Sequence, residues 1–237
     1  MLGSHFVAPT PDDVIQRRNM VDCQIRTVDV TDHAVIARFF DVPREKFLPA
    51  ELVPFAYSDM ALKLVPAGPE NEPRQLLAPA VLARLIQAAA VKPSDKVLDV
   101  ASGNGYSAAI FAGLAKEVVA VEADSVRSEA IKANLALAGI ESVRVLTGPL
   151  SDGAALDAPF DVIFINGAVE SHLDLPFRQL RPGGRLVTIL HATQAPGGGA
   201  SYAVRYESQS GGISALILFD AEAPVLNAFR KQAEFVF

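Results

Sequence analysis

Short apolar runs alternate with longer segments of helical periodicity between residues 73 and 190. The runs KVLDVAS, EVVAVEAD, SVRVLTG and FDVIFING have the length and β-branched content of buried strands. A chain that alternates strand and helix in this way builds parallel strands joined by crossover helices. The alternation therefore predicts an α/β fold with a doubly wound, mostly parallel, Rossmann-like sheet.

The segments on either side of this alternation follow other patterns. An acidic helix start at PDDVIQRRNM precedes TDHAVIARFFDVP, in which Thr31 or Asp32 is expected to cap a helix that Pro43 ends. Near the other end, YAVRYES and SALILFD flank the turn QSGG, which is typical of an antiparallel hairpin, and EFVF is expected to add a last strand. We therefore predict an N-terminal helical cap over residues 1–72 and a second domain over residues 73–237 with C-terminal antiparallel strands.

Composition narrows the classes of partner. Half of the 237 residues are hydrophobic and 20% are charged, so the chain can bury a sizeable core. The formal net charge of −6 and the absence of a basic run argue against nucleic acid and anionic membranes as partners. The single cysteine fits a reducing compartment, and no apolar run reaches the length of a membrane span. We expect a cytoplasmic protein.

One loop carries the strongest signal for a ligand. In VLDVASGNGYSAA, residues 97–109, a strand runs into small residues and then into a helix, and Gly103 to Ala108 match the pattern G-x-G-x-x-G/A. Glu122 ends the next predicted strand, where a carboxylate binds ribose hydroxyls. The pattern by itself allows a dinucleotide, S-adenosylmethionine or an empty structural turn.

Asp99 separates these alternatives. It lies four residues before Gly103, at the strand end that faces a ligand. A carboxylate there repels a pyrophosphate, which binds best to backbone N–H groups and a helix N-terminus. It favours a cation, and S-adenosylmethionine carries an ammonium and a sulfonium but no phosphate. Glu122 fits either ligand and does not discriminate.

Residues 97–190 look like a class I S-adenosylmethionine-dependent methyltransferase, because the Gly-rich loop is followed by FDVIFING and then by RQLRPGGRLV. The flanks are more specific. VPREKFLP and AYSD, within residues 42–59, resemble the VPRExFVP and AYxDxxLP runs of the protein-L-isoaspartate O-methyltransferases. The end EFVF is similar to that family's RFVP-like ending, so the resemblance spans residues 14–237.

The resemblance implies a reaction. Members of the family transfer a methyl group from S-adenosylmethionine to the free carboxylate of an isoaspartyl residue in a damaged protein or peptide, and S-adenosylhomocysteine is the product. A carboxylate is already a nucleophile at neutral pH, so alignment matters more than a general base. This accounts for the lack of a catalytic triad in the sequence, and the scattered histidines predict no metal site.

The resemblance also assigns site residues. The cofactor's methionine part is expected on the first loop, at Asp99, Ala101, Ser102, Gly103 and Gly105. Its ribose is expected at the end of the second strand, at Glu122 and Ala123. Its adenine is expected after the third strand, at Gly148, Pro149 and Leu150. Asn166 is expected to contact both the cofactor and the reacting groups. The residues expected at the reacting methyl group are Gln75, Leu77 and Asn166, and those expected at the substrate are Arg74, Gln75, Leu76, Leu77, Gly167 and Ala168.

Several of these positions depart from the family's pattern. The family has G-x-T-I-S-x-P before the core, where this chain has Gln75 for the threonine and Leu77 for the serine. It has a glycine at Ala101, and GDG where this chain has an uncharged Gly-Pro-Leu run at residues 148–150. Leucine cannot donate a hydrogen bond to a carboxylate, so we hypothesise that Arg74 or Gln75 binds the substrate carboxylate instead.

The departures leave alternatives open. The chain is either an isoaspartyl methyltransferase with altered substrate preference, or a family member that binds the cofactor in a regulatory role without turnover. A small-molecule O-methyltransferase is a third interpretation. The sequence does not indicate the oligomeric state.

Overall fold

The computed structural model of the chain describes residues 11–64, 74–192 and 199–231. The expected last strand EFVF lies outside the described residues, as does the boundary that we predict between residues 72 and 73. The division into two domains stays a prediction.

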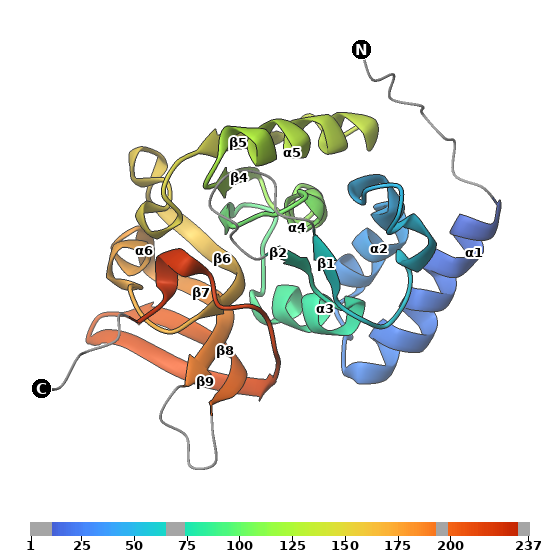
Figure 1. Cartoon of the computed structure of the whole chain (residues 1–237). Coiled ribbons are helices and arrows are strands. Elements are labelled where there is room, and N and C mark those ends of the chain that lie inside the picture. The colour runs from blue at the N-terminus through green and yellow to red at the C-terminus, as the bar shows by residue number, and fades with distance from the viewer. Residues whose placement is uncertain (1–10, 65–73, 193–198, 232–237) are drawn as a thin grey trace, which may run out of the picture.

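A seven-stranded sheet forms the centre of the described chain, in the order β5-β4-β3-β6-β7-β8-β9 (Figure 1). The first five strands in this order pair in parallel and the last two antiparallel, which confirms the doubly wound sheet and the C-terminal hairpin. The strands are β3 (Lys96–Val100), β4 (Glu117–Glu122), β5 (Val143–Thr147), β6 (Phe160–Val169), β7 (Leu180–Ala192), β8 (Ala200–Gln209) and β9 (Gly212–Asp220).

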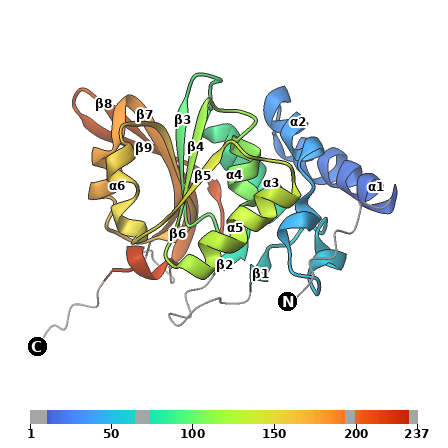
Figure 2. The same ribbon diagram turned by 90° about the horizontal axis from the view of Figure 1, so that it is seen from above.

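The two faces of the sheet bury different sets of side chains. Alternation along each strand sends Val97 and Val118 to one face and Leu98 and Val119 to the other. Helices cover both faces, with α6 opposite the others, as Figure 2 shows. They are α3 (Pro79–Ala88), α4 (Tyr106–Phe111), α5 (Ser125–Leu137) and α6 (Asp174–Arg178).

The N-terminal segment is helical, as its sequence predicts. It contains α1 (Pro11–Met20), a π-helical turn (Val21–Ile25) and α2 (His33–Asp41), which lie beyond α3 in Figure 2. Asp32 caps α2 by accepting hydrogen bonds from the backbone N–H groups of two residues in the first turn. Helix α2 ends before Pro43, as expected.

A short antiparallel pair joins this segment to the core. Strand β1 (Leu62–Leu64) pairs with β2 (Arg74–Leu76), with Leu62 opposite Leu76 and Leu64 opposite Arg74. Figure 1 shows the pair beside the central sheet, on the side of α3 and α4. Leu62 of β1 and Leu76 of β2 are both buried, so each strand of the pair packs a side chain in the core.

The strand that carries Asn166 is longer than the sequence predicts. FDVIFING was expected to end at Gly167, whereas β6 continues to Val169, with a shift of register against β7 between Phe164 and Ala168. Leu226 packs where a Gly167 side chain would lie, and Ala168 bridges to Val225. The predicted strand end at Gly167 is therefore two residues short, because Ala168 and Val169 pair with Ile189 and Leu190 of β7 beyond the shift of register.

Candidate cofactor and active site

The loop between β3 and α4 has the backbone of a glycine-rich turn. Gly103 and Gly105 have φ values of 66° and 89°, in the left-handed region. A Cβ atom on Gly105 would lie 3.0 Å from Ile131 of α5, so the loop approaches that helix closely. At Gly103, Leu64 of β1 is the nearest side chain, 3.6 Å from the corresponding Cβ position. The β1–β2 pair therefore covers the loop with an apolar side chain.

Ala101 occupies a strained position in the same loop. Its φ is 59°, and the side chain is fully buried. A left-handed conformation costs an L-residue about 1–2 kcal/mol. The residue therefore stands where the backbone favours glycine, which is the residue that the sequence comparison with the family led us to expect.

Asp99 is buried at the end of β3 and points toward α4. Its Oδ2 atom accepts hydrogen bonds of 2.7 Å from the hydroxyls of Ser102 and Ser107. Burial raises the pKa of Asp99 to about 7, although the hydrogen bonds from both serines favour the charged form and lower it. Asp99 thus titrates near neutral pH.

Asn166 belongs to the same cluster. Its Nδ2 atom donates a 3.2 Å hydrogen bond to Ser107 Oγ, which connects β6 to the Asp99 carboxyl group. Among the described residues, the Oδ1 atoms of Asp99 and Asn166 are buried without a hydrogen-bond partner. Buried acceptors of this kind are unfavourable unless a donor reaches them, so the cluster is suited to a ligand with N–H groups.

Glu122 lies at the end of β4 and carries an ion pair with Arg74. The Nε and Nη2 atoms of Arg74 each lie 2.9 Å from a different carboxylate oxygen of Glu122. Both side chains are almost fully inaccessible to solvent, at 1% and 0% exposure. The expected substrate ligand Arg74 therefore binds the expected ribose ligand Glu122 in this structure.

Backbone donors complete the surroundings of Glu122. The N–H of Gly103 donates to Oε1 at 2.7 Å, and the N–H of Ala123 donates to Oε2 at 3.0 Å. The carboxylate thus connects the β3–α4 loop, the start of the loop after β4 and the β1–β2 pair.

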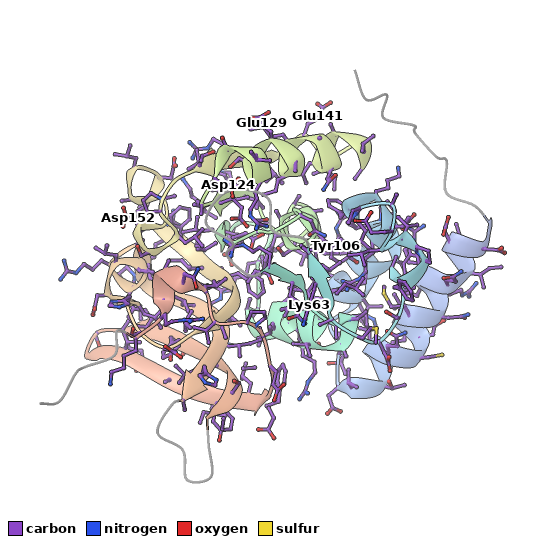
Figure 3. All side chains as sticks on the ribbon, viewed as in Figure 1. Lys63, Tyr106, Asp124, Glu129, Glu141 and Asp152 are labelled. Carbon is purple, nitrogen blue, oxygen red and sulfur yellow. The ribbon has the colours of Figure 1, made fainter. Side chains whose placement is uncertain are left out.

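The segment after β5 offers one open position. A side chain at Gly148 would meet nothing within 4 Å, so the backbone there is free to face a ligand. Leu150, which we expected beside the adenine, is 1% exposed and packs in the core below α6. Pro149 precedes it and donates no backbone hydrogen bond. Figure 3 shows Asp152 just beyond this segment and Asp124 at the N-terminus of α5.

The segment expected at the substrate is largely buried. Leu76 and Leu77 are core residues, and Gln75 is half-buried on β2 opposite Lys63, which Figure 3 labels. The backbone carbonyl of Leu77 accepts a 2.7 Å hydrogen bond from Arg44. The Leu77 side chain therefore contributes packing, and its carbonyl is already used by another residue.

Two residues of this region were not predicted from the sequence. Ser107 links Asp99 to Asn166, and Arg44 fixes the carbonyls of Ala56 and Leu77 from within the core. A hydroxyl in the first turn after a Gly-rich loop is a signal that identifies Ser107 in retrospect. Arg44 belongs to the VPRE run, but its partners are distant in sequence and could not be inferred from it.

A cavity of about 290 Å³ opens beside the glycine-rich loop. Gly103 and Leu64 line it together with Arg127 of α5 and Phe47 of the N-terminal segment. Within the described ranges, no group of three or more metal-binding side chains occurs, and no helix there has the length and apolar character needed to cross a membrane.

Known proteins resemble this chain in sequence. The family model "Protein-L-isoaspartate(D-aspartate) O-methyltransferase (PCMT)" matches residues 16–196. A protein-L-isoaspartate O-methyltransferase of Koribacter versatilis is 35% identical over 184 residues, which is 76% of this chain and 80% of the relative. One of Methylorubrum extorquens is 35% identical over 179 residues, which is 76% of this chain and 75% of that relative.

Solved structures share the fold. One protein-L-isoaspartate O-methyltransferase superposes with a TM-score of 0.77 at 22% identity, over 89% of this chain and 66% of that one. A beta-aspartate methyltransferase of Plasmodium falciparum, in complex with S-adenosyl-L-homocysteine, superposes with a TM-score of 0.69 at 18% identity, over 91% and 98% of the two chains. From the family model and the curated relatives together, this chain belongs to the protein-L-isoaspartate(D-aspartate) O-methyltransferase family.

Proposed function

We propose that the chain is an S-adenosylmethionine-dependent methyltransferase that methylates the carboxylate of isoaspartyl residues in proteins or peptides. The observation that carries the proposal is the pair of unpartnered, buried Oδ1 atoms of Asp99 and Asn166 beside a glycine-rich loop. Two acceptors in one cluster suit the ammonium of a methionine group, and the chain's family membership supports the same cofactor.

Of the other residues expected at the cofactor, the glycines leave space for it, whereas Glu122 is occupied by other partners. Gly103 and Gly148 leave space along the carboxyl edge of the sheet, as a ligand laid across that edge requires. Glu122 fits a ribose diol by chemistry, but Arg74 and two backbone N–H groups now fill its acceptor positions. Arg74 therefore has to leave Glu122 before ribose hydroxyls bind there.

The protein's own part in the reaction is positioning and exclusion of water. When bound, S-adenosylmethionine supplies a methyl group on a sulfonium. An isoaspartyl carboxylate is ionised at neutral pH and needs no base, so the chain has to align it and keep water away. Leu64 covers the loop, and Leu76 and Leu77 close the core behind β2, which gives the site a low-dielectric wall.

A second candidate function is binding of the cofactor without turnover. The specific observation is that Leu77 stands where the family has a hydroxyl residue and is buried in the core. Nothing at this side chain can donate a hydrogen bond to a substrate carboxylate. In that case the protein senses S-adenosylmethionine and releases it unchanged.

One pair of measurements tests both candidates. Calorimetry with S-adenosylmethionine measures binding, and release of methanol after incubation with an isoaspartyl peptide measures methyl ester formation. Binding with methanol release supports the methyltransferase. Binding without it supports the sensor, and the absence of binding contradicts both. D99A is the control, because it removes the carboxyl group that we place at the cofactor's ammonium.

A further inference from the structure

The ion pair between Arg74 and Glu122 joins the short β1–β2 pair to the central sheet. Arg74 is the first residue of β2, and Glu122 is the last residue of β4. The guanidinium meets the carboxylate with two bonds of 2.9 Å, which is the bidentate geometry in which arginine binds carboxylates best. Both side chains are withdrawn from water.

All of the acceptor capacity of Glu122 is used. An ionised carboxylate has about four acceptor positions. Arg74 Nε and the Gly103 N–H share Oε1, and Arg74 Nη2 and the Ala123 N–H share Oε2. The two backbone donors belong to the loops that shape the site, so Arg74 alone among these partners can be removed by a side-chain movement.

The two partners are held with different firmness. Glu122 lies in the central sheet, where β4 pairs with a strand on each side. Arg74 lies at the end of the β1–β2 pair, whose described register holds three residue pairs and joins no other strand there. Leu62 and Leu76 of this pair pack in the core, so side-chain burial and not strand pairing holds it. Arg74 therefore belongs to a pair that its own side-chain packing holds in place, whereas Glu122 is held by strand pairing on both sides.

We propose that Arg74 and the ribose diol of the cofactor compete for Glu122, so that Arg74 determines how tightly the site binds ligands with a 2′,3′-diol. The proposal rests on the proposed function, in which Glu122 receives the ribose. When only a fraction of molecules has Arg74 away from Glu122, the apparent association constant equals the intrinsic constant multiplied by that fraction. The arginine thereby raises the cofactor concentration at which half of the sites are occupied.

Calorimetry of S-adenosylhomocysteine with the full chain tests the competition. The wild type is compared with R74Q, which removes the charge and the bidentate fork, and each is titrated with S-adenosylhomocysteine and with its 2′,3′-dideoxy analogue. We expect R74Q to bind S-adenosylhomocysteine at least about tenfold more tightly than the wild type, which corresponds to about 1.4 kcal/mol. The analogue has no hydroxyls for Glu122 to bind, so its affinities for the wild type and for R74Q are expected to differ by less than about twofold.

R185Q is the matched control. Arg185 also forms a buried ion pair, with Asp95 at 2.6 Å, and Asp95 lies just before the amino end of β3, whereas Glu122 lies at the carboxyl end of β4. Loss of that pair is expected to lower stability without tightening S-adenosylhomocysteine binding. A gain shared by R74Q and R185Q would mean that general loosening, and not release of Glu122, raises the affinity.

The outcomes separate this inference from the function beneath it. Unchanged or weaker binding of S-adenosylhomocysteine by R74Q, or an equal gain with the dideoxy analogue, overturns the competition while the cofactor assignment stands. If neither the wild type nor R74Q binds S-adenosylhomocysteine, the competition and the cofactor assignment are both overturned. Binding by R74Q alone supports the competition in its strongest form.

A second variant covers the risk that R74Q folds poorly. R74K keeps the charge but replaces the fork with a point charge, so it is expected to fold and to show a smaller gain than R74Q. Thermal unfolding with and without S-adenosylhomocysteine gives an independent readout, because the ligand-induced change in Tm reports affinity even in a less stable variant. A change in R74K no larger than in the wild type counts against the proposal.

Discussion

The hydroxyl of Ser107 donates a 2.7 Å hydrogen bond to Asp99, and this contact ties the end of β3 to the first turn of α4. Ser107 also accepts from Asn166, so one small side chain holds groups from a helix and two neighbouring strands together. The cluster places an acid of raised pKa next to an amide, both with an unused oxygen. The charge of this acid is expected to govern both the stability of the protein and its affinity for the cofactor.

Stability is expected to fall as the pH rises toward 8. The pKa of Asp99 is about 7 in the folded protein and 3.8 ordinarily, so the folded state binds the proton more tightly. The stabilisation from this proton is complete below the ordinary pKa and is lost as the pH rises through 7. A difference of one between the folded and unfolded pKa values corresponds to about 1.4 kcal/mol. Urea unfolding of the wild type and D99N between pH 4 and 8 measures the effect. An equally steep decline in D99N would assign it to other groups.

Cofactor binding is expected to follow the opposite trend. An ammonium interacts better with the ionised form of Asp99, so the affinity for S-adenosylhomocysteine rises as the pH increases from 6 to 8, around the pKa of about 7. Calorimetry at several pH values measures the trend in the wild type and D99N. A flat profile in the wild type would mean that the ligand's ammonium does not face this carboxyl group.

The A101G variant is expected to be more stable than the wild type by about 1 kcal/mol. Glycine removes the free-energy cost of the left-handed backbone. The conformational entropy that glycine adds to the unfolded chain offsets part of this gain. A90G is the matched control, because Ala90 also has a positive φ, of 46°. Ala90 is exposed and lies before the amino end of β3, away from the glycine-rich loop. If A90G gains stability while A101G loses it, packing of the Ala101 methyl group outweighs its strain.

The L77A variant is expected to lose about 3 kcal/mol of unfolding free energy, as is typical for truncation of a core leucine. Leu77 is 2% exposed and packs in the core, so its loss should not change the affinity for S-adenosylhomocysteine of the folded protein. Leu156 is fully exposed, and L156A controls for the substitution itself. A large drop in affinity with little loss of stability would place Leu77 in contact with the ligand.

The sequence predicts those parts of the fold that depend on neighbouring residues. Alternating apolar runs identify the strands, Asp32 is recognisable as a helix cap, and QSGG marks the hairpin between β8 and β9. The glycine-rich loop and its acid identify the expected ligand edge because both lie within one short segment. The structure places Asp99 at the strand end that leads into this loop, as expected.

The parts that sequence does not reveal depend on distant partners. Arg74 meets Glu122 from 48 positions away, and no local pattern predicts which carboxylate an arginine will find. The strand predicted over FDVIFING continues past Gly167, because Ala168 and Val169 pair with β7 beyond a shift of register that the sequence does not signal. The left-handed backbone at Ala101 is indicated only by the glycine that the family has there, because alanine itself carries no signal for it.

The order of strands in the sheet sets the order in which the chain can assemble. β3 pairs on one side with β4, which follows soon after it, but on the other side with β6, where Val97 meets Val162. Contacts between residues this far apart form slowly, because a long loop must close first. The hairpin of β8 and β9 is local by contrast. During synthesis, β3 therefore keeps one edge unpaired until β6 has left the ribosome, and the ligand edge is assembled late.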